Sequence, residues 1–103
     1  MKEQKGEKMN IGEGAIVTRL EFGDPRLFRD LLGQHDEHLK MIQRNLGVRI
    51  HIRGAAMEIE GDPVEVELST KVIRQLYGLL EKGYPVYGSD VDYAIRILSG
   101  DGR

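Results

Sequence analysis

Residues 31–52, LLGQHDEHLKMIQRNLGVRIHI, place two helix-like segments and a strand in direct succession. Gly33 is suited to end the first segment, and after only two more residues Asp36 can cap the second. The second segment ends at Gly47 and carries apolar residues at helical spacing, namely Leu39, Ile42 and Leu46. This order predicts two helices that are joined by a tight turn and followed at once by a strand.

The predicted strand continues into a β-hairpin. Apolar and polar residues alternate from Val48 to Arg53 and again from Met57 to Glu60. A two-residue turn at Gly54–Ala55, with glycine suited to the first position of a type II′ turn, keeps the apolar residues of both strands on one face. The predicted cross-strand pairs are Ile52–Met57, Ile50–Ile59, His51–Glu58 and Arg49–Glu60.

Flanking segments add a strand before this unit and a long helix after it. Residues 15–22 alternate as a half-buried strand, and Asp24 with Pro25 begins the first helix. Asp62 is placed to cap the long helix, with Glu65 completing a capping-box pattern, and Gly83 ends it. The predicted buried stripe of this helix is Val64, Leu68, Val72, Leu76 and Leu79 or Leu80.

A short helix is predicted near the C-terminus. Ser89 and Asp92 have the spacing of a capping box, and the apolar residues that follow the helical period are Val91, Ala94, Ile95 and Leu98. Because a helix of this length is marginally stable alone, we expect it to dock on the rest of the domain.

Composition limits the class of protein. The chain has 103 residues, 40% of them hydrophobic and 31% charged, which suits one globular domain. It has no cysteine and no apolar run of the ~18 residues that a membrane helix needs, so we expect a cytoplasmic protein with no membrane partner. The net charge is −2, but residues 26–53 hold six basic residues against three acids, whereas 54–83 hold six acids against three basic residues. An anion site is therefore expected in the first region.

The stretch 31–52 resembles the core of a K-homology (KH) RNA-binding domain. The family's apolar pair, GxxG loop, helix, glycine and alternating strand have counterparts at Leu31, Leu32, Gly33, Leu39, Ile42, Gly47, Val48, Ile50 and Ile52. The resemblance implies an α+β, type I KH-like fold, with a three-stranded antiparallel sheet packed on helices in the order β-α-α-β-β-α and here an extra C-terminal helix. The chain departs from the family at Asp36, which stands in place of the second glycine of the loop.

A longer resemblance is to the N-terminal region of PhoH-like proteins, the phosphate-starvation-inducible P-loop ATPases. It is carried by LLGQHDEHLKMIQRNLGVRI, EIEGDPVEVEL, LYGLLEKGYPV and DVDYAIRIL. The resemblance implies a bacterial protein linked to RNA metabolism, whose separate ATPase domain binds ATP and Mg²⁺. The chain contains no P-loop pattern, G-x-x-x-x-G-K-[ST], so we expect it to bind no cofactor and to be no enzyme by itself. The expected division is a disordered leader over 1–13, the KH-like domain over 14–83, and a linker and helix over 84–103 that lead to an absent ATPase domain.

The KH resemblance also implies a nucleic-acid site around the turn between the two helices. In that family the loop backbone approaches phosphates, and the groove beside it reads about four unpaired nucleotides. The residues expected to contact single-stranded RNA around this groove are Gly33, Gln34, His35, Lys40, Arg49 and Arg53. Asp36 is expected to compete with a phosphate for the backbone donors of the second helix. The alternative is that the charged residues form a solvated surface, with Arg49 and His51 paired to Glu60 and Glu58.

Other kinds of site have weaker signals. His35 and His38 have no third metal ligand at a suitable spacing, and Glu58 and Glu60 fall on an exposed strand face, so we expect neither a metal site nor a catalytic site. The apolar segment Tyr84–Tyr87 either packs the last helix onto the domain or contacts the ATPase domain or a second copy of the chain. An alternative function is therefore a protein-interaction or oligomerisation module that positions the ATPase domain.

Overall fold

The computed structural model describes residues 14–100 and the backbone of residues 7–10. The elements in chain order are β1 (Glu7–Asn10), β2 (Ile16–Glu21), α1 (Pro25–Leu32), the 3-10 turn η1 (Gln34–Asp36), α2 (Glu37–Leu46), β3 (Arg49–Arg53), β4 (Ala56–Gly61), α3 (Pro63–Glu81) and α4 (Gly88–Leu98). None of the helices in this part of the chain is long and apolar enough to cross a membrane.

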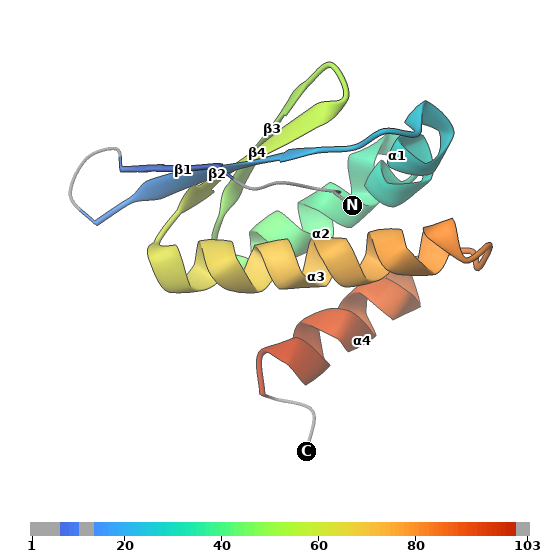
Figure 1. Cartoon of the computed structure of the whole chain (residues 1–103). Coiled ribbons are helices and arrows are strands. Elements are labelled where there is room, and N and C mark those ends of the chain that lie inside the picture. The colour runs from blue at the N-terminus through green and yellow to red at the C-terminus, as the bar shows by residue number, and fades with distance from the viewer. Residues whose placement is uncertain (1–6, 11–13, 101–103) are drawn as a thin grey trace.

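The strands form an antiparallel sheet in the order β1-β2-β4-β3. The long helix α3 runs beneath the sheet and contacts β2 and β4, while α1 and α2 lie beside it (Figure 1). The three predicted strands are β2, β3 and β4. The strand that comes last in the sequence, β4, lies between the other two, and the helices occur in the predicted order. The type I KH-like α+β fold is therefore confirmed.

The sheet has one strand more than the sequence pattern predicted. Backbone pairing sets Glu7 opposite Arg19 and Asn10 opposite Ile16, so β1 extends the sheet beyond the edge of β2. This segment was expected to belong to a disordered leader, because residues 1–13 are polar, lysine-rich and carry glycines. The rest of that expected leader, residues 1–6 and 11–13, lies outside the residues that the structure describes.

The hairpin has the predicted register. Ile52 lies opposite Met57 and Ile50 opposite Ile59, with Arg49 opposite Glu60 on the other face. Gly54 has φ +64°, a left-handed conformation that glycine adopts without steric cost. The period-two pattern and the short turn were thus sufficient to fix the pairing.

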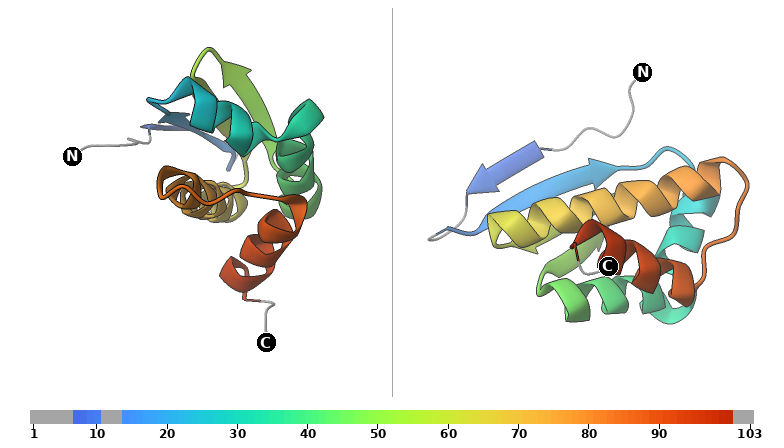
Figure 2. Two further views of the ribbon diagram at one scale, coloured as in Figure 1. Left: turned by 90° about the vertical axis from the view of Figure 1, so that its right-hand side faces the viewer. Right: turned by 90° about the horizontal axis from the view of Figure 1, so that it is seen from below.

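Helix α3 buries a wider face than the predicted stripe, of which Val72, Leu76 and Leu80 are buried. Val64 is exposed, and the buried residues are Val66, Ser69, Val72, Ile73, Leu76, Tyr77 and Leu80. The difference arises because α3 contacts the sheet, α1, α2 and α4, which together cover a wider face than a single stripe. Figure 2 shows α3 enclosed between these elements.

Helix α4 packs against α2 and α3 through Val91, Ala94 and Ile95, as expected. Its predicted capping box is wrong, because the helix begins at Gly88 and the Asp90 carboxylate accepts a hydrogen bond from the Tyr87 N–H at 2.8 Å. Asp62 makes no side-chain cap at the start of α3, whereas Asp24 caps α1 by accepting from two backbone N–H groups.

Candidate nucleic-acid interface

The turn between α1 and α2 has an unusual backbone. Gly33 has φ +81° and ψ 168°, and both His35 and Asp36 are in the left-handed region with φ +55° and +58°. Histidine and aspartate are among the few non-glycine residues that are enriched there, although each such residue still costs about 1 kcal/mol or more. Asp36 therefore has a backbone conformation that a glycine would adopt without strain.

Asp36 does not use its side chain as a cap. It occupies the N-cap position of α2, but its carboxylate accepts no hydrogen bond from the backbone of the helix. The turn is held by backbone hydrogen bonds, from Asp36 N–H to the Gly33 carbonyl at 3.1 Å and from Glu37 N–H to the Gln34 carbonyl. The predicted side-chain cap is thus wrong, because the carboxylate does not bind the backbone donors of the helix.

His38 explains why residue 33 must be glycine in this chain. The imidazole ring is buried against Gly33, and a Cβ atom at position 33 would lie 2.8 Å from the Cγ atom of His38. Real Cβ atoms do not approach other atoms so closely. Gly33 is therefore required by packing as well as by its backbone angles, independently of any phosphate.

Lys40 lies on the flank of α2 that faces the edge of the sheet. Gln43, one helical turn further on, reaches β3 and accepts a hydrogen bond from the Ile50 N–H at 2.8 Å. Residues three apart in a helix share a face, so the exposed Lys40 stands beside the same edge. Ile50 is half-buried and Ile52 is 38% exposed, which makes this edge partly aliphatic. The exposed Gln34 and His35 complete the flank at the turn.

Arg49 and Arg53 lie elsewhere. The register puts both on the outer face of the sheet, opposite the face that packs on the helices. Arg49 Nη2 is 3.2 Å from Glu60 Oε2, and Arg53 Nε is 3.1 Å from Glu58 Oε1. Gly33, Gln34 and His35 thus lie in one turn and Lys40 follows in the first turn of α2, but the structure does not place the two arginines beside them.

The outer face carries a network of ion pairs. Glu58 also accepts a hydrogen bond from Arg19 Nη1 at 3.3 Å. His51 lies opposite Glu58 in the ladder, as predicted, but its Nε2 atom is 3.5 Å from Glu60 Oε1. The hydrogen bond from Arg53, with the charges of Arg53 and Arg19, lowers the pKa of the Glu58 carboxyl below its ordinary value. The alternative reading of these side chains as a paired surface is therefore confirmed for Arg49 and its partner Glu60.

The two histidines of the turn do not face a common ion. His35 is exposed, whereas His38 is buried and its Nδ1 atom is 3.0 Å from the Leu31 carbonyl oxygen. Across residues 14–100, no group of three or more potential metal ligands comes together.

Sequence reasoning missed two residues of this region. Gln43 was not singled out, and His38 was considered only as one of a possible metal pair. Gln43 lies three residues before the buried Leu46, and this spacing does not indicate which backbone group its side chain will contact. The burial of His38 has a weak signal in the sequence, since it lies four residues before Ile42 and eight before Leu46, at the start of the same apolar period.

The fold and the left-handed turn at the start of α2 define a KH-like domain. The chain is also similar to curated PhoH-like proteins: it is 33% identical over 79 residues to one from Mycobacterium tuberculosis (strain ATCC 25618 / H37Rv), 32% identical over 79 residues to one from Mycobacterium leprae and 30% identical over 85 residues to one from Bacillus subtilis. The chain is therefore homologous to one segment of these PhoH-like proteins.

The similarity covers most of this chain but a small part of its relatives. The matches span 77–82% of the chain and only 22–27% of the length of these PhoH-like proteins. Neither a protein-family model nor a solved structure matches the chain.

Proposed function

We propose that this chain is the single-stranded RNA-binding, KH-like domain of a PhoH-like, ATP-binding protein that takes part in RNA metabolism. The observation that carries the proposal is the left-handed turn from Gly33 to Asp36 at the start of α2. It leaves the first N–H groups of the helix without a side-chain cap, and such groups bind anions such as phosphate. Lys40 follows in the first turn of α2, and Gln43, three residues further on, contacts the edge of β3.

The proposed contact surface consists of Gly33, Gln34, His35 and Lys40, with the aliphatic edge at Ile50 and Ile52. Arg49 and Arg53 are left out of it, because both are engaged with carboxylates on the outer face of the sheet. Binding by the isolated chain should be weak, since the net charge is −2 and no aromatic residue stands on this flank.

The test is fluorescence anisotropy with mixed-sequence RNA and single-stranded DNA of about ten nucleotides, at low and at physiological salt. We expect saturable binding that favours RNA and weakens as the salt concentration rises. Absence of binding at low salt would remove the proposal.

Two charge reversals locate the contact. Lys40→Glu should weaken RNA binding at least fivefold and reduce the dependence of log K on log salt by about 0.7, the value for one phosphate on a single strand. Arg49→Glu is the matched control on the outer face and should have a much smaller effect. Equal losses from both variants would mean that the outer face of the sheet, rather than the flank of the turn, binds RNA.

A third variant tests the altered loop position. Asp36→Gly keeps a residue that accepts positive φ and removes the negative charge at the start of α2. It should strengthen RNA binding severalfold, and an unchanged or lower affinity would show that phosphate does not approach this turn.

A further inference from the structure

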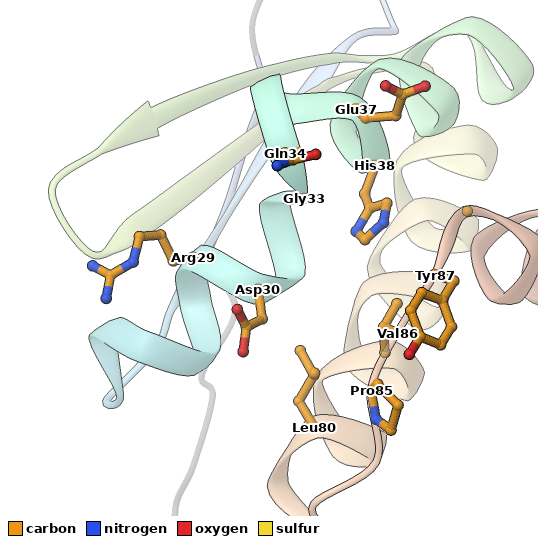
Figure 3. A pocket seen from close by; sticks show the side chains of 11 residues that line it. Arg29, Asp30, Gly33, Gln34, Glu37, His38, Leu80, Pro85, Val86 and Tyr87 are labelled. Atoms are coloured by element: carbon orange, nitrogen blue, oxygen red, sulfur yellow. The ribbon is translucent and has the colours of Figure 1, made fainter.

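A pocket of about 680 Å³ lies between the C-terminal end of α1, the turn η1 and the segment that joins α3 to α4 (Figure 3). Its lining shares Gly33 and Gln34 with the proposed RNA surface but includes no residue of β3 and not Lys40. One wall is apolar, formed by Leu80, Pro85 and Val86. A pocket of this volume can hold one long side chain with its neighbours.

The polar group best defined in this pocket is His38. A carbonyl oxygen can only accept, so the 3.0 Å contact with Leu31 means that Nδ1 carries the proton and donates it. In the neutral ring the other nitrogen, Nε2, is then an acceptor. The residue is 7% exposed and its ring points into the cavity in Figure 3, while hydrogen bonds among the described residues leave Nε2 unused.

A second acceptor faces the same space. Asp30, on α1, points toward the cavity and forms no ion pair with the described residues, whereas Arg29 and Glu37 at the rim point away from it (Figure 3). Tyr87 lies at the opposite rim and is 63% exposed. With His38 neutral, the two carboxylates and one guanidinium of the lining sum to a formal charge of −1.

We propose that this pocket binds an arginine side chain of a partner protein. The aliphatic stem of the arginine would lie along Leu80, Pro85 and Val86, and its guanidinium would donate hydrogen bonds to the Asp30 carboxylate and to His38 Nε2. The exposed ring of Tyr87 offers a face on which a guanidinium can stack. The acceptors of the pocket would face the N–H donors of the guanidinium, and the aromatic ring would lie against its planar cation.

The charge of the pocket favours a protein partner over nucleic acid. A phosphate would meet the Asp30 carboxylate in a lining that is negative overall. The pocket shares Gly33 and Gln34 with the proposed RNA contact, whereas Asp30 and His38 belong to the pocket alone, so substitutions at Asp30 and at Lys40 test the two sites separately.

The test is a titration of the ¹⁵N-labelled chain with Nα-acetyl-arginine methylamide, followed by NMR. We expect saturable shifts at Asp30, Gln34 and Tyr87, together with a shift of the His38 Nε2 resonance, which reports directly on hydrogen bonding at that atom. The citrulline analogue, which has the same shape without the positive charge, should bind at least fivefold more weakly.

Two substitutions separate the pocket from a general charge effect. Asp30→Asn should weaken binding of the arginine probe at least fivefold. Asp62→Asn is the matched control, because Asp62 is exposed, makes no side-chain cap and lies at the opposite end of α3 from Leu80. Equal binding of the citrulline analogue, equal effects of the two substitutions, or tighter binding of adenosine or guanosine monophosphate in the same pocket would each overturn the proposal.

Discussion

Gly33 is the residue at which backbone and packing requirements coincide. Its angles, φ +81° and ψ 168°, lie in a region that is essentially restricted to glycine, and the His38 ring occupies the place of a side chain. Gly33→Ala should therefore lower the free energy of unfolding by roughly 3 kcal/mol, combining backbone strain with displacement of the ring. Urea denaturation would measure the loss.

The hairpin provides a control for this substitution. Gly54 also has a positive φ, +64°, but no atom lies within 4 Å of the position of its Cβ. Gly54→Ala should thus cost only the backbone term, about 1 kcal/mol. If both alanine variants lose the same stability, the contact between Gly33 and His38 contributes nothing, and the glycine is needed only for its backbone.

At the scale of elements, Gln43 connects α2 to the edge of β3. Gln43→Met keeps the length of the side chain but leaves the Ile50 N–H without its acceptor, which should cost about 1 kcal/mol. Amide hydrogen exchange measured by NMR should show a loss of protection of about fivefold at Ile50. Arg44→Met, at the next and exposed position of α2, should leave Ile50 protected. Unchanged exchange at Ile50 in the Gln43 variant would show that the helix is held to the strand by other contacts.

Elements with a strong local period could be predicted from the sequence, and elements set by distant contacts could not. The hairpin register followed from alternation and a two-residue turn, because a shift by one residue would expose every apolar side chain. By contrast, β1 has no such pattern and is defined by its pairing with β2, and the buried face of α3 depends on what surrounds it. Among the site residues, the turn was located correctly, but the alternation that placed Arg49 and Arg53 beside acidic partners also places them away from the turn.

The stability of the whole molecule should decline at both extremes of pH, for two separate reasons. The pKa of Glu58 is lowered in the folded state, mainly by the hydrogen bond from Arg53, so its contribution is present above the unfolded pKa and is lost as the pH falls through the folded value. Burial raises the pKa of the Tyr77 phenol, so its contribution is present below the unfolded pKa of about 10 and is lost as the pH rises through the folded value.

Urea denaturation across the pH range, with one variant for each limb, would test this assignment. Glu58→Gln should flatten the decline on the acid side, below about pH 5, and leave the alkaline side unchanged. Tyr77→Phe keeps the ring that packs against Phe22 at a centroid distance of 4.8 Å, so it should flatten only the alkaline decline. High salt should weaken the acid-side effect, since the ion pairs of the outer sheet face are accessible to solvent, and should affect the buried phenol less. An acid limb of the same steepness in the Glu58 variant would assign that loss of stability to other carboxylates.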